Sequence, residues 1–342
     1  MKEPNKRTNL IAITLLLLAT SSSCQAKESA RTEFVLGTVC TVNLFEKGTK
    51  DSYDEIFARL RAIDACLSAN REDSNLAEIN RAAGVSPVKA APDTLKVLSE
   101  ALAFSARTDG AFDPAIGPVV KLWNIGTDFA AVPAPDDLKK ALALVSWKDI
   151  ALDGRAGTVF LAKKGMRLDL GAIAKGFAAD EVAQIVARRG IKRAMIDLGG
   201  NIYAIGEKAP GKPWIIGIRD PSISRGEPIA SLPVINKTIV TSGIYERYFE
   251  KDGVHYHHIL DPKTGYPENN ELLSVTIVTG NSMDADALST STFLLGTERG
   301  MALLASLPGT EGIFISKDKK IRLTPGLRGK VTILDTRFSI VE

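Results

Sequence analysis

The sequence predicts an α+β fold. Apolar residues repeat with the two-residue period of strands in some stretches and the 3.6-residue period of helices in others, and the stretches come in runs without strict alternation. The chain has 342 residues, enough to bury a large core, and contains neither an internal repeat nor a long linker. We therefore expect a single unit with a mixed sheet and packed helices after the N-terminal segment.

The N-terminal third contains one expected strand and three expected helices. Residues 34–45 are rich in Val, Thr and Leu, which favours a strand. Ser74 is the expected N-cap of a short helix that ends at Asn80, and residues 92–107 predict another helix. Between the strand and Ser74, apolar residues recur with helical spacing at Tyr53, Ile56, Phe57, Leu60, Ile63 and Leu67.

The rest of the chain contains runs of helical pattern and runs of strand pattern. Residues 113–144 are helical in pattern but are interrupted by Gly126 and Pro133. Residues 172–188 predict a long amphipathic helix, and residues 214–278 are mostly strands separated by turn signals. The remaining expected elements are short strands at residues 193–196 and 202–205, helices at 283–295 and 297–306, and strands near 312–316 and 330–335.

Composition excludes several classes of protein. Hydrophobic residues make up 45% of the chain, as in a globular protein, and the formal net charge is only +3. No basic block, RNP-type motif or zinc-ligand spacing occurs, so we expect no nucleic-acid partner. Three cysteines and three histidines are too few for a disulfide framework or a structural zinc site. Cys40 and Cys66 are expected to be buried thiols, and the sequence leaves a bridge between them open.

The N-terminus has the features of an export signal. Basic residues near the start are followed by an apolar stretch at residues 10–19, which is too short to span a bilayer. Residues 1–24 are therefore expected to be a lipoprotein signal whose Cys24 is acylated, with ordinary cleavage after Ala26 as the alternative. Two acyl chains hold a protein firmly at a membrane. We expect a protein that is exported and lipid-anchored to the periplasmic face of the inner membrane.

A phosphate-binding helix start is expected at residues 169–176, Asp-Leu-Gly-Ala-Ile-Ala-Lys-Gly. Asp169 ends a strand, a glycine permits a tight turn, and a helix begins near Ala172 with Lys175 on its first turn. The free backbone N–H groups and the dipole of a helix start attract an anion. The P-loop spacing is absent, and a capped helix with a surface lysine fits the same residues.

Hard oxygen ligands gather in residues 283–290, Met-Asp-Ala-Asp-Ala-Leu-Ser-Thr. Asp286 and Thr290 are four residues apart and share one face of the expected helix. A carboxylate, a hydroxyl and a nearby carbonyl are ligands that Mg²⁺ uses when it also keeps water and phosphate oxygens. The alternative is helix capping by Asp284, which leaves Thr290 inside an apolar stretch unexplained.

Three further turns contain polar residues or glycines that suggest a binding site. Residues 258–265 begin with His258 at the end of a strand and continue into a Pro/Gly turn, a common way to present a site, although a structural histidine is the alternative. In residues 109–114 an aromatic residue and a carboxylate flank a turn. The glycines of residues 197–201 allow a ligand to approach the backbone closely.

Several motifs follow one another along the chain in a characteristic order. They are Leu36-Gly-Thr38, Ser68-x-Asn70, Ser74-x-Leu-x-x-Ile-Asn80, Gly110-Ala-Phe-Asp-Pro114, Asp169-Leu-Gly-Ala-Ile-Ala-Lys-Gly176, Asp197-Leu-Gly-Gly-Asn201, Thr241-Ser-Gly243, His258-Ile-Leu-Asp-Pro-x-Thr-Gly265 and Ala285-Asp-Ala-Leu-Ser-Thr290. From Phe34 to about Leu304 the sequence thereby resembles the ApbE family, the FAD:protein FMN transferases. The resemblance implies a T-fold-like catalytic unit over residues 30–342 that splits FAD, releases AMP and joins FMN through its phosphate to a threonine or serine of another protein. The family's known acceptors are subunits of membrane redox complexes.

The resemblance also assigns site residues, motif by motif. Mg²⁺ would be held by Asp286, Thr290 and backbone oxygens of Ala172 and Ser289, the last of which is usually alanine in the family. Magnesium and Lys175 would neutralise the pyrophosphate, and His258 would take the proton of the acceptor hydroxyl or steady the phosphate. FAD would contact Leu36, Asn70, Ala111, Phe112, Asp113, Asp169, Lys175 and Leu260.

Asn70 departs from the family pattern, which commonly has tyrosine at this position. A tyrosine can stack on a ring of FAD, an interaction worth about 1 kcal/mol, and exclude water. Asparagine leaves room for water, so we expect hydrolysis of FAD to FMN and AMP beside transfer. Leu36 replaces the usual methionine at similar volume. A lipoprotein that stores FAD without turnover is the alternative function, but it would not need both Asp286 and Thr290.

Overall fold

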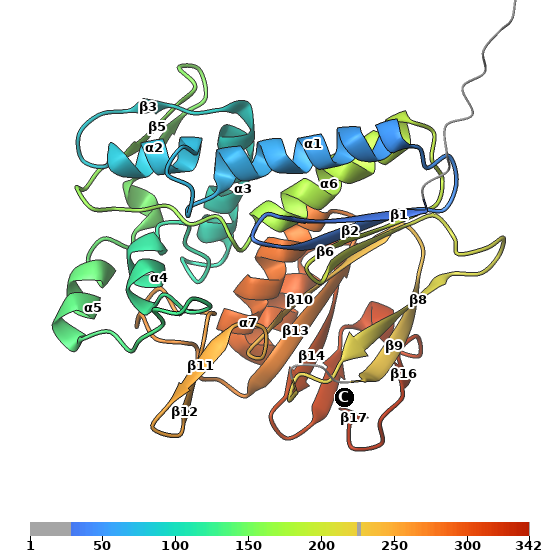
Figure 1. Cartoon of the computed structure of the whole chain (residues 1–342). Helices are drawn as coiled ribbons and strands as arrows, with labels where there is room; N and C mark the ends of the chain where they lie inside the picture. Colours follow the sequence, from blue (N-terminus) through green and yellow to red (C-terminus); the bar gives the residue numbers. More distant parts are fainter. Residues whose placement is uncertain (1–28, 224–226, 342) are drawn as a thin grey trace, which may run out of the picture.

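A nine-stranded sheet runs through the molecule (Figure 1). The computed structural model describes residues 29–223 and 227–341, so the predicted signal and Cys24 lie outside the described residues. Neighbouring strands of the sheet are antiparallel except the last two. In spatial order the strands are β1 (Ala30–Val35), β2 (Thr38–Leu44), β6 (Ala194–Leu198), β7 (Asn201–Ile205), β10 (Lys237–Gly243), β13 (Leu272–Thr279), β14 (Glu311–Ser316), β15 (Lys320–Leu323) and β17 (Ser339–Val341).

Three smaller sheets surround the large one. The first consists of β8 (Trp214–Arg219), β9 (Pro228–Val234) and β16 (Thr332–Ile333), and its apolar side chains form one core cluster with those on a face of the large sheet. The second consists of β3 (Val88–Lys89), β5 (Thr158–Leu161) and β4 (Ile150–Asp153), and the third is the hairpin of β11 (Tyr248–Lys251) and β12 (Val254–His257).

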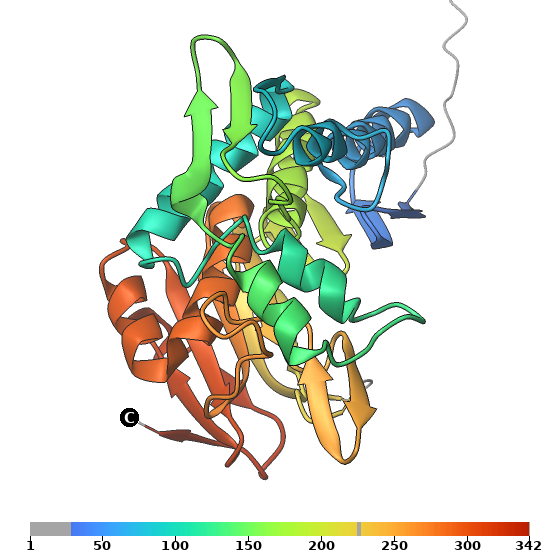
Figure 2. The ribbon, with the colours of Figure 1, turned by 90° about the vertical axis from the view of Figure 1, so that its left-hand side faces the viewer.

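Helices cover the opposite face of the large sheet (Figures 1 and 2). The long helices α1 (Lys50–Leu67), α6 (Ala174–Arg188) and α7 (Ser282–Ala305) bury their apolar sides against it. The other helices are α2 (Asn75–Arg81), α3 (Pro92–Arg107), α4 (Gly117–Trp123) and α5 (Pro135–Leu142), with short 3₁₀ helices at Trp147–Asp149 and Pro325–Leu327. The predicted α+β class is confirmed.

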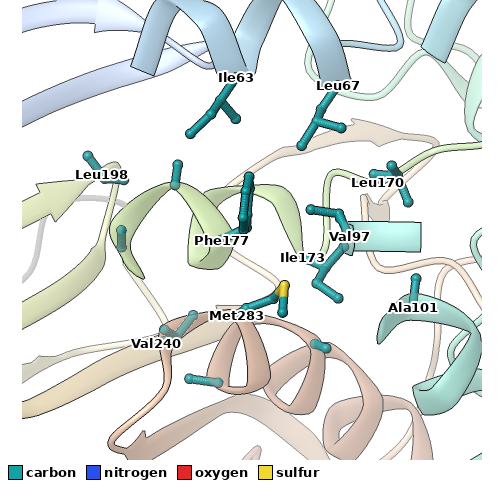
Figure 3. Close-up of a cluster of buried hydrophobic side chains, with 14 of the residues drawn as sticks. Ile63, Leu67, Val97, Ala101, Leu170, Ile173, Phe177, Leu198, Val240 and Met283 are labelled. Carbon is teal, nitrogen blue, oxygen red and sulfur yellow. The ribbon is translucent and has the colours of Figure 1, made fainter. Parts of the chain in front are cut away.

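The main core lies where α6 packs between α1 and α7. Phe177 of α6 is almost fully buried, with Ile63 and Leu67 of α1 on one side and Met283 of α7 on the other (Figure 3). Full burial of one such large apolar side chain stabilises the fold by about 1.5–3 kcal/mol. This core therefore fixes the position of α6 against both neighbouring helices.

Helices α6 and α7 approach each other at Gly176 more closely than a side chain would permit. A Cβ at Gly176 would lie only 2.1 Å from the carbonyl oxygen of Ser282. The carboxylate of Asp180, one turn further along α6, accepts hydrogen bonds from the N–H groups of Ser282 and Met283, both at 2.8 Å. The first turns of the two helices are thus held side by side.

Most predicted helices are confirmed. The helix predicted at residues 92–107 is α3, and Ser74 caps α2 by accepting a hydrogen bond from the N–H of Ala77. The two helices predicted at residues 283–295 and 297–306 form α7, which is broken at Gly296 by a φ of 73°. Asp284 is not the N-cap, because the side chain of Asn281 accepts the hydrogen bond from its N–H instead.

Strand boundaries were harder to predict. The strand predicted at residues 34–45 is confirmed as β2 over residues 38–44, but its start is wrong. Leu36 and Gly37 take positive φ angles of 57° and 68° and turn the chain from β1 into β2. The strand predicted near residues 330–335 is limited to Thr332–Ile333, and β15 and β17 were not predicted.

The two described cysteines are free thiols, which excludes a bridge between them. Cys40 is buried and donates to the carbonyl of Val35, and Cys66 lies 3.2 Å from the hydroxyl of Thr94. Burial raises the pKa of Cys40 to about 12, so this thiol stays protonated. None of the described helices is both long enough and apolar enough to cross a membrane.

Replacing Gly176 by alanine should force the two helices apart. We expect Gly176→Ala to lower the free energy of unfolding by about 3 kcal/mol or more, because the new methyl group overlaps backbone atoms of α7. Urea unfolding measures this loss. Gly154→Ala is the matched control, since a Cβ there meets open space. Equal stability of the two variants would contradict the crowded crossing.

Candidate functional site

A cleft of about 220 Å³ lies between α4, the end of β10 and the first turns of α6 and α7. One end of the cleft is polar and includes Asp169, Lys175, Asp286 and Thr290. The other end is apolar and is lined by Phe112, Ile116, Val120, Trp123, Ile125 and Leu260. The cleft therefore suits a ligand with a charged group at one end and a ring at the other.

The polar end is built on the start of α6. Asp169 is held by a hydrogen bond from its N–H to the carbonyl of Pro114, and its Oδ1 accepts from the N–H of Gly171. The N-cap residue Ile173 makes no side-chain capping hydrogen bond, and on the first turn of α6 the carboxylate of Asp286 accepts a hydrogen bond from the N–H of Gly176. Lys175 on that turn donates to the carbonyl of Gly171 at 3.1 Å. The ammonium group of Lys175 is the cation that could attract an anion here, and the anion site that the sequence predicts stays a prediction.

Asp286 is a buried carboxylate at the centre of the helix crossing. Its side chain is 5% exposed, its Oδ2 accepts a hydrogen bond from the N–H of Gly176 at 2.9 Å, and its Oδ1 lies 3.4 Å from Nζ of Lys175. A buried carboxylate is tolerated when a cation and hydrogen-bond donors compensate its charge. The close crossing at Gly176 brings the ammonium group of Lys175 and the N–H of Gly176 to the carboxylate of Asp286.

Oxygen ligands for a metal ion lie beside Asp286. Thr290 lines the cleft one turn further along α7, with its hydroxyl 3.2 Å from that of Ser242, and Ala172 lines it from the start of α6. Among the described residues no three His, Cys, Asp or Glu side chains form a metal-binding group. One carboxylate, one hydroxyl and one carbonyl nevertheless fit Mg²⁺, which keeps water and phosphate oxygens as its other ligands.

His258 presents an unprotonated ring nitrogen to the cleft. Its Nδ1 lies 3.3 Å from the carbonyl oxygen of Arg247, and because a carbonyl only accepts, Nδ1 carries the proton. Burial, together with the nearby Arg247 charge, lowers the pKa of His258 to about 3. The ring is therefore neutral near pH 7, with Nε2 free to accept a hydrogen bond.

The apolar end is fixed by buried hydrogen bonds. Asp113 accepts from the N–H groups of Ala115 and Trp147 at 2.8 and 3.0 Å, and burial raises the pKa of its carboxyl to about 6. Trp123 is fully buried and donates from Nε1 to the carbonyl of Gly265 at 2.7 Å. The Pro/Gly turn after His258 is thereby tied to α4.

The structure brings most of the predicted site residues together. Three of them do not line the cleft. Leu36 lies in the β1–β2 turn, Asn70 is exposed after α1, and Ser289 is fully buried, with its hydroxyl donating to the carbonyl of Asp286. The predicted residues that line it are Ala111, Phe112, Asp113, Asp169, Ala172, Lys175, His258, Leu260, Asp286 and Thr290.

Sequence analysis missed several residues of the cleft. Ser242 lies in β10, and Glu246 and Arg247 follow the end of this strand by three and four residues. Ser242 stands in one of the motifs of the resemblance, but no role was assigned to any of the three. Trp123 gave no signal beyond its helical position. Asn201 also lines the cleft, and its side-chain nitrogen has no hydrogen-bond partner, unlike every other buried side-chain N or O in the described part of the chain.

A second cleft of about 550 Å³ lies at the other edge of the large sheet. It is lined by charges of both signs, and Glu271 there already binds the N–H and hydroxyl of Thr297 at the break in α7. None of the predicted site residues lies in it. The smaller cleft is therefore the candidate functional site.

Known proteins resemble this chain over most of its length. A family model described as the ApbE family matches residues 36–314. The chain is 43% identical over 351 residues to the FAD:protein FMN transferase of Treponema pallidum, with 96% of each covered. It is 40% identical over 296 residues to the protein of the same name from Klebsiella pneumoniae, which covers 85% of this chain and 92% of the relative.

Solved structures show the same fold. The ApbE protein of Thermotoga maritima has a TM-score of 0.79 and 32% identity, covering 87% of this chain and 97% of that one. The flavin transferase ApbE of Vibrio cholerae has a TM-score of 0.79 and 30% identity, covering 88% of this chain and 98% of that one.

The buried carboxyl of Asp180 should make stability depend on pH. Burial raises its pKa from 3.8 to about 6. A carboxyl whose pKa is higher in the folded chain contributes its full stability below about pH 4 and loses it as the pH rises through about 6. Relative to Asp180→Asn, the native chain should therefore lose on the order of 2–3 kcal/mol between these limits. Urea unfolding at both pH values tests this, and an unchanged difference between the two proteins would contradict it.

Proposed function

The chain belongs to the ApbE family, and we propose that it is an FAD:protein FMN transferase. It would cleave FAD, release AMP and join FMN through its phosphate to a threonine or serine of another protein. The observation that carries this proposal is the pairing of Lys175 with Asp286 at the start of α6, in a cleft that also has apolar side chains in its lining. FAD has the matching layout, because a ring system lies on each side of its pyrophosphate.

The residues of the cleft divide the work of binding FAD. The ammonium group of Lys175, on the first turn of α6, holds the pyrophosphate. A ring of FAD enters the apolar end, where Phe112 and Leu260 are 4% and 7% exposed and supply apolar surface. Asp113 and Asp169 are fixed by backbone hydrogen bonds and so keep both ends in a set geometry.

Asp286, Thr290 and the carbonyl of Ala172 would hold a Mg²⁺ ion, with Ser289 contributing only its backbone oxygen. When bound, the ion neutralises charge on the pyrophosphate and on the departing AMP. Lys175 adds a second positive charge at the same place. The 3.4 Å separation of Lys175 and Asp286 supports this arrangement, since both groups then face the same phosphates.

His258 handles the hydroxyl of the acceptor residue. Its Nδ1–H is taken by the carbonyl of Arg247, so Nε2 can accept the hydroxyl proton as the oxygen attacks phosphorus. This tautomer supports proton transfer over the alternative of steadying the phosphate, because an unprotonated nitrogen has no hydrogen to donate to a phosphate oxygen.

The acceptor is proposed to be a subunit of a membrane redox complex, reached from the periplasmic face of the inner membrane. The export signal and Cys24 in the sequence support a lipid anchor there. Incubating the full chain with FAD, Mg²⁺ and a candidate acceptor, and following AMP, FMN and flavin-labelled acceptor, tests the whole proposal. Absence of AMP under every condition would refute it.

Asp286→Asn should lower AMP release by on the order of 10²-fold, because the amide keeps an oxygen for the N–H of Gly176 but loses the charge that holds a cation. Asp284→Asn, two residues earlier on α7 and outside the residues that line the cleft, is the matched control and should leave turnover unchanged. AMP formation from FAD, measured with folded proteins of equal stability, decides the outcome. Normal turnover in Asp286→Asn would rule out the metal site.

A second activity, FAD hydrolysis, is proposed from Asn70. Asn70 is exposed outside the cleft, and the hydrogen bond it makes among the described residues runs from its N–H to Ser68. Its amide side chain has no aromatic surface that could extend over bound FAD. Asn70→Tyr should therefore suppress the release of free FMN while flavin transfer continues. FMN and labelled acceptor measured in one reaction test this expectation. Equal hydrolysis in the variant and the native chain would show that water enters by another route.

A further inference from the structure

Glu246 is a carboxylate of the cleft that has no protein partner. It follows the end of β10, lines the cleft with Lys175 and Arg247, and makes no hydrogen bond or ion pair with any described residue. Arg247 beside it makes no side-chain ion pair in the described chain either. Its methylene groups pack on Gly126, where an added Cβ would lie 3.3 Å from Cδ of Arg247. Two adjacent charges thus point into the cleft without neutralising contacts.

The backbone holds Glu246 in this position. The N–H of Ile244 donates to the carbonyl of Leu273, and the ring of Tyr245 packs directly over Gly243, where a Cβ would lie 2.4 Å from the ring. Because Tyr245 is turned into the protein, the next side chain along is directed to the cleft. The charged groups that act on Glu246 are Lys175 of α6, Asp286 of α7, Arg219 of β8 and its neighbour Arg247.

Charge decides what Glu246 can bind. The pyrophosphate of FAD is anionic and is drawn to Lys175, so a second carboxylate facing it would be repelled. A carboxylate accepts hydrogen bonds and donates none, so its ligand must carry donors. On FAD, the donors on either side of the pyrophosphate are the hydroxyl groups of the ribityl chain and of the ribose. Paired hydroxyls of a sugar are a standard ligand of a fixed carboxylate.

We propose that Glu246 is a specificity-determining residue that accepts hydrogen bonds from sugar hydroxyls of FAD next to the pyrophosphate. This inference rests on the proposed function, and it gives Glu246 a role in binding and none in proton transfer, which His258 performs. Desolvation by the surrounding protein atoms raises the pKa of Glu246. A hydroxyl group that donates to the carboxylate stabilises its ionised form and so offsets this desolvation. The ribityl chain and the ribose share this chemistry, and the experiment separates them.

The test is equilibrium binding, followed by the fluorescence of the flavin. Glu246→Ala should raise the Kd for FAD about ten- to hundredfold, while kcat at saturating FAD changes little, because the lost contact is equal in ground and transition states. Glu250→Gln, an exposed carboxylate on β11 outside the cleft, is the matched control and should leave the Kd unchanged.

Two analogues identify the hydroxyl group. One analogue lacks the 2′-hydroxyl of the ribose and the other lacks a hydroxyl of the ribityl chain. The native chain should bind one of them more weakly than FAD, and Glu246→Ala should bind that analogue and FAD equally, because the contact is already absent.

Several results would overturn the proposal. The first is a Kd for FAD that is unchanged in Glu246→Ala. The second is that Glu246→Ala weakens the binding of FAD and of both analogues by the same factor. The third is a lower kcat for transfer with unchanged FAD binding, which would assign Glu246 to the acceptor hydroxyl. AMP release by the native chain is measured in the same samples. Active native protein with unchanged binding in Glu246→Ala refutes the role of Glu246 alone, whereas inactive native protein refutes the proposed function.

Discussion

The site depends on the close approach of α6 and α7 at Gly176. The absence of a side chain lets the backbone of Ser282 lie against α6, and only at this distance can Asp286 accept a hydrogen bond from the N–H of Gly176. The same contact places the carboxylate beside Lys175. The carboxylate of Asp180 fixes the first turn of α7 by accepting hydrogen bonds from its N–H groups. One steric constraint thus fixes both helix starts and the pair of charges between them.

The buried carboxylate of Asp286 serves the fold and the chemistry together. It compensates a backbone N–H that α6 leaves open, and it supplies negative charge where a cation can neutralise phosphate. The surrounding charges are arranged accordingly. His258 is kept neutral by burial, and within residues 29–223 and 227–341 no cation lies at hydrogen-bond distance from Glu246. In the proposed function, the cleft offers positive charge to the pyrophosphate of FAD and hydrogen-bond acceptors to the sugar hydroxyls beside it.

Local sequence signals predicted elements well where one residue sets the conformation. Ser74 gave the start of α2, and Gly296 gave the break in α7. The β1–β2 hairpin was missed because Leu36 takes a positive φ that its side chain disfavours, so the turn carried no strong residue signal. Asp284 was assigned as a cap from its position, whereas Asn281 makes that hydrogen bond.

The site was predictable where motifs mark helix starts, as at Lys175 and Asp286, but its assembly was not. The contact between α6 and α7 joins residues far apart in sequence. No sequence pattern near Gly176 indicates that the backbone of α7 will pack against it. Glu246 was missed for a similar reason, because its direction depends on Tyr245 packing over Gly243. Asn70 was placed by resemblance, and the structure leaves it exposed outside the cleft.

A double-mutant cycle between Lys175 and Asp286 tests the central claim most directly. The rate of AMP release from FAD is measured for the native chain, Lys175→Met, Asp286→Asn and the double variant. If the crossing of α6 and α7 makes the two charges one catalytic unit, the double variant should be little slower than the slower single variant, with a coupling energy of about 1–3 kcal/mol. Additive losses, with coupling below about 0.5 kcal/mol, would contradict this account.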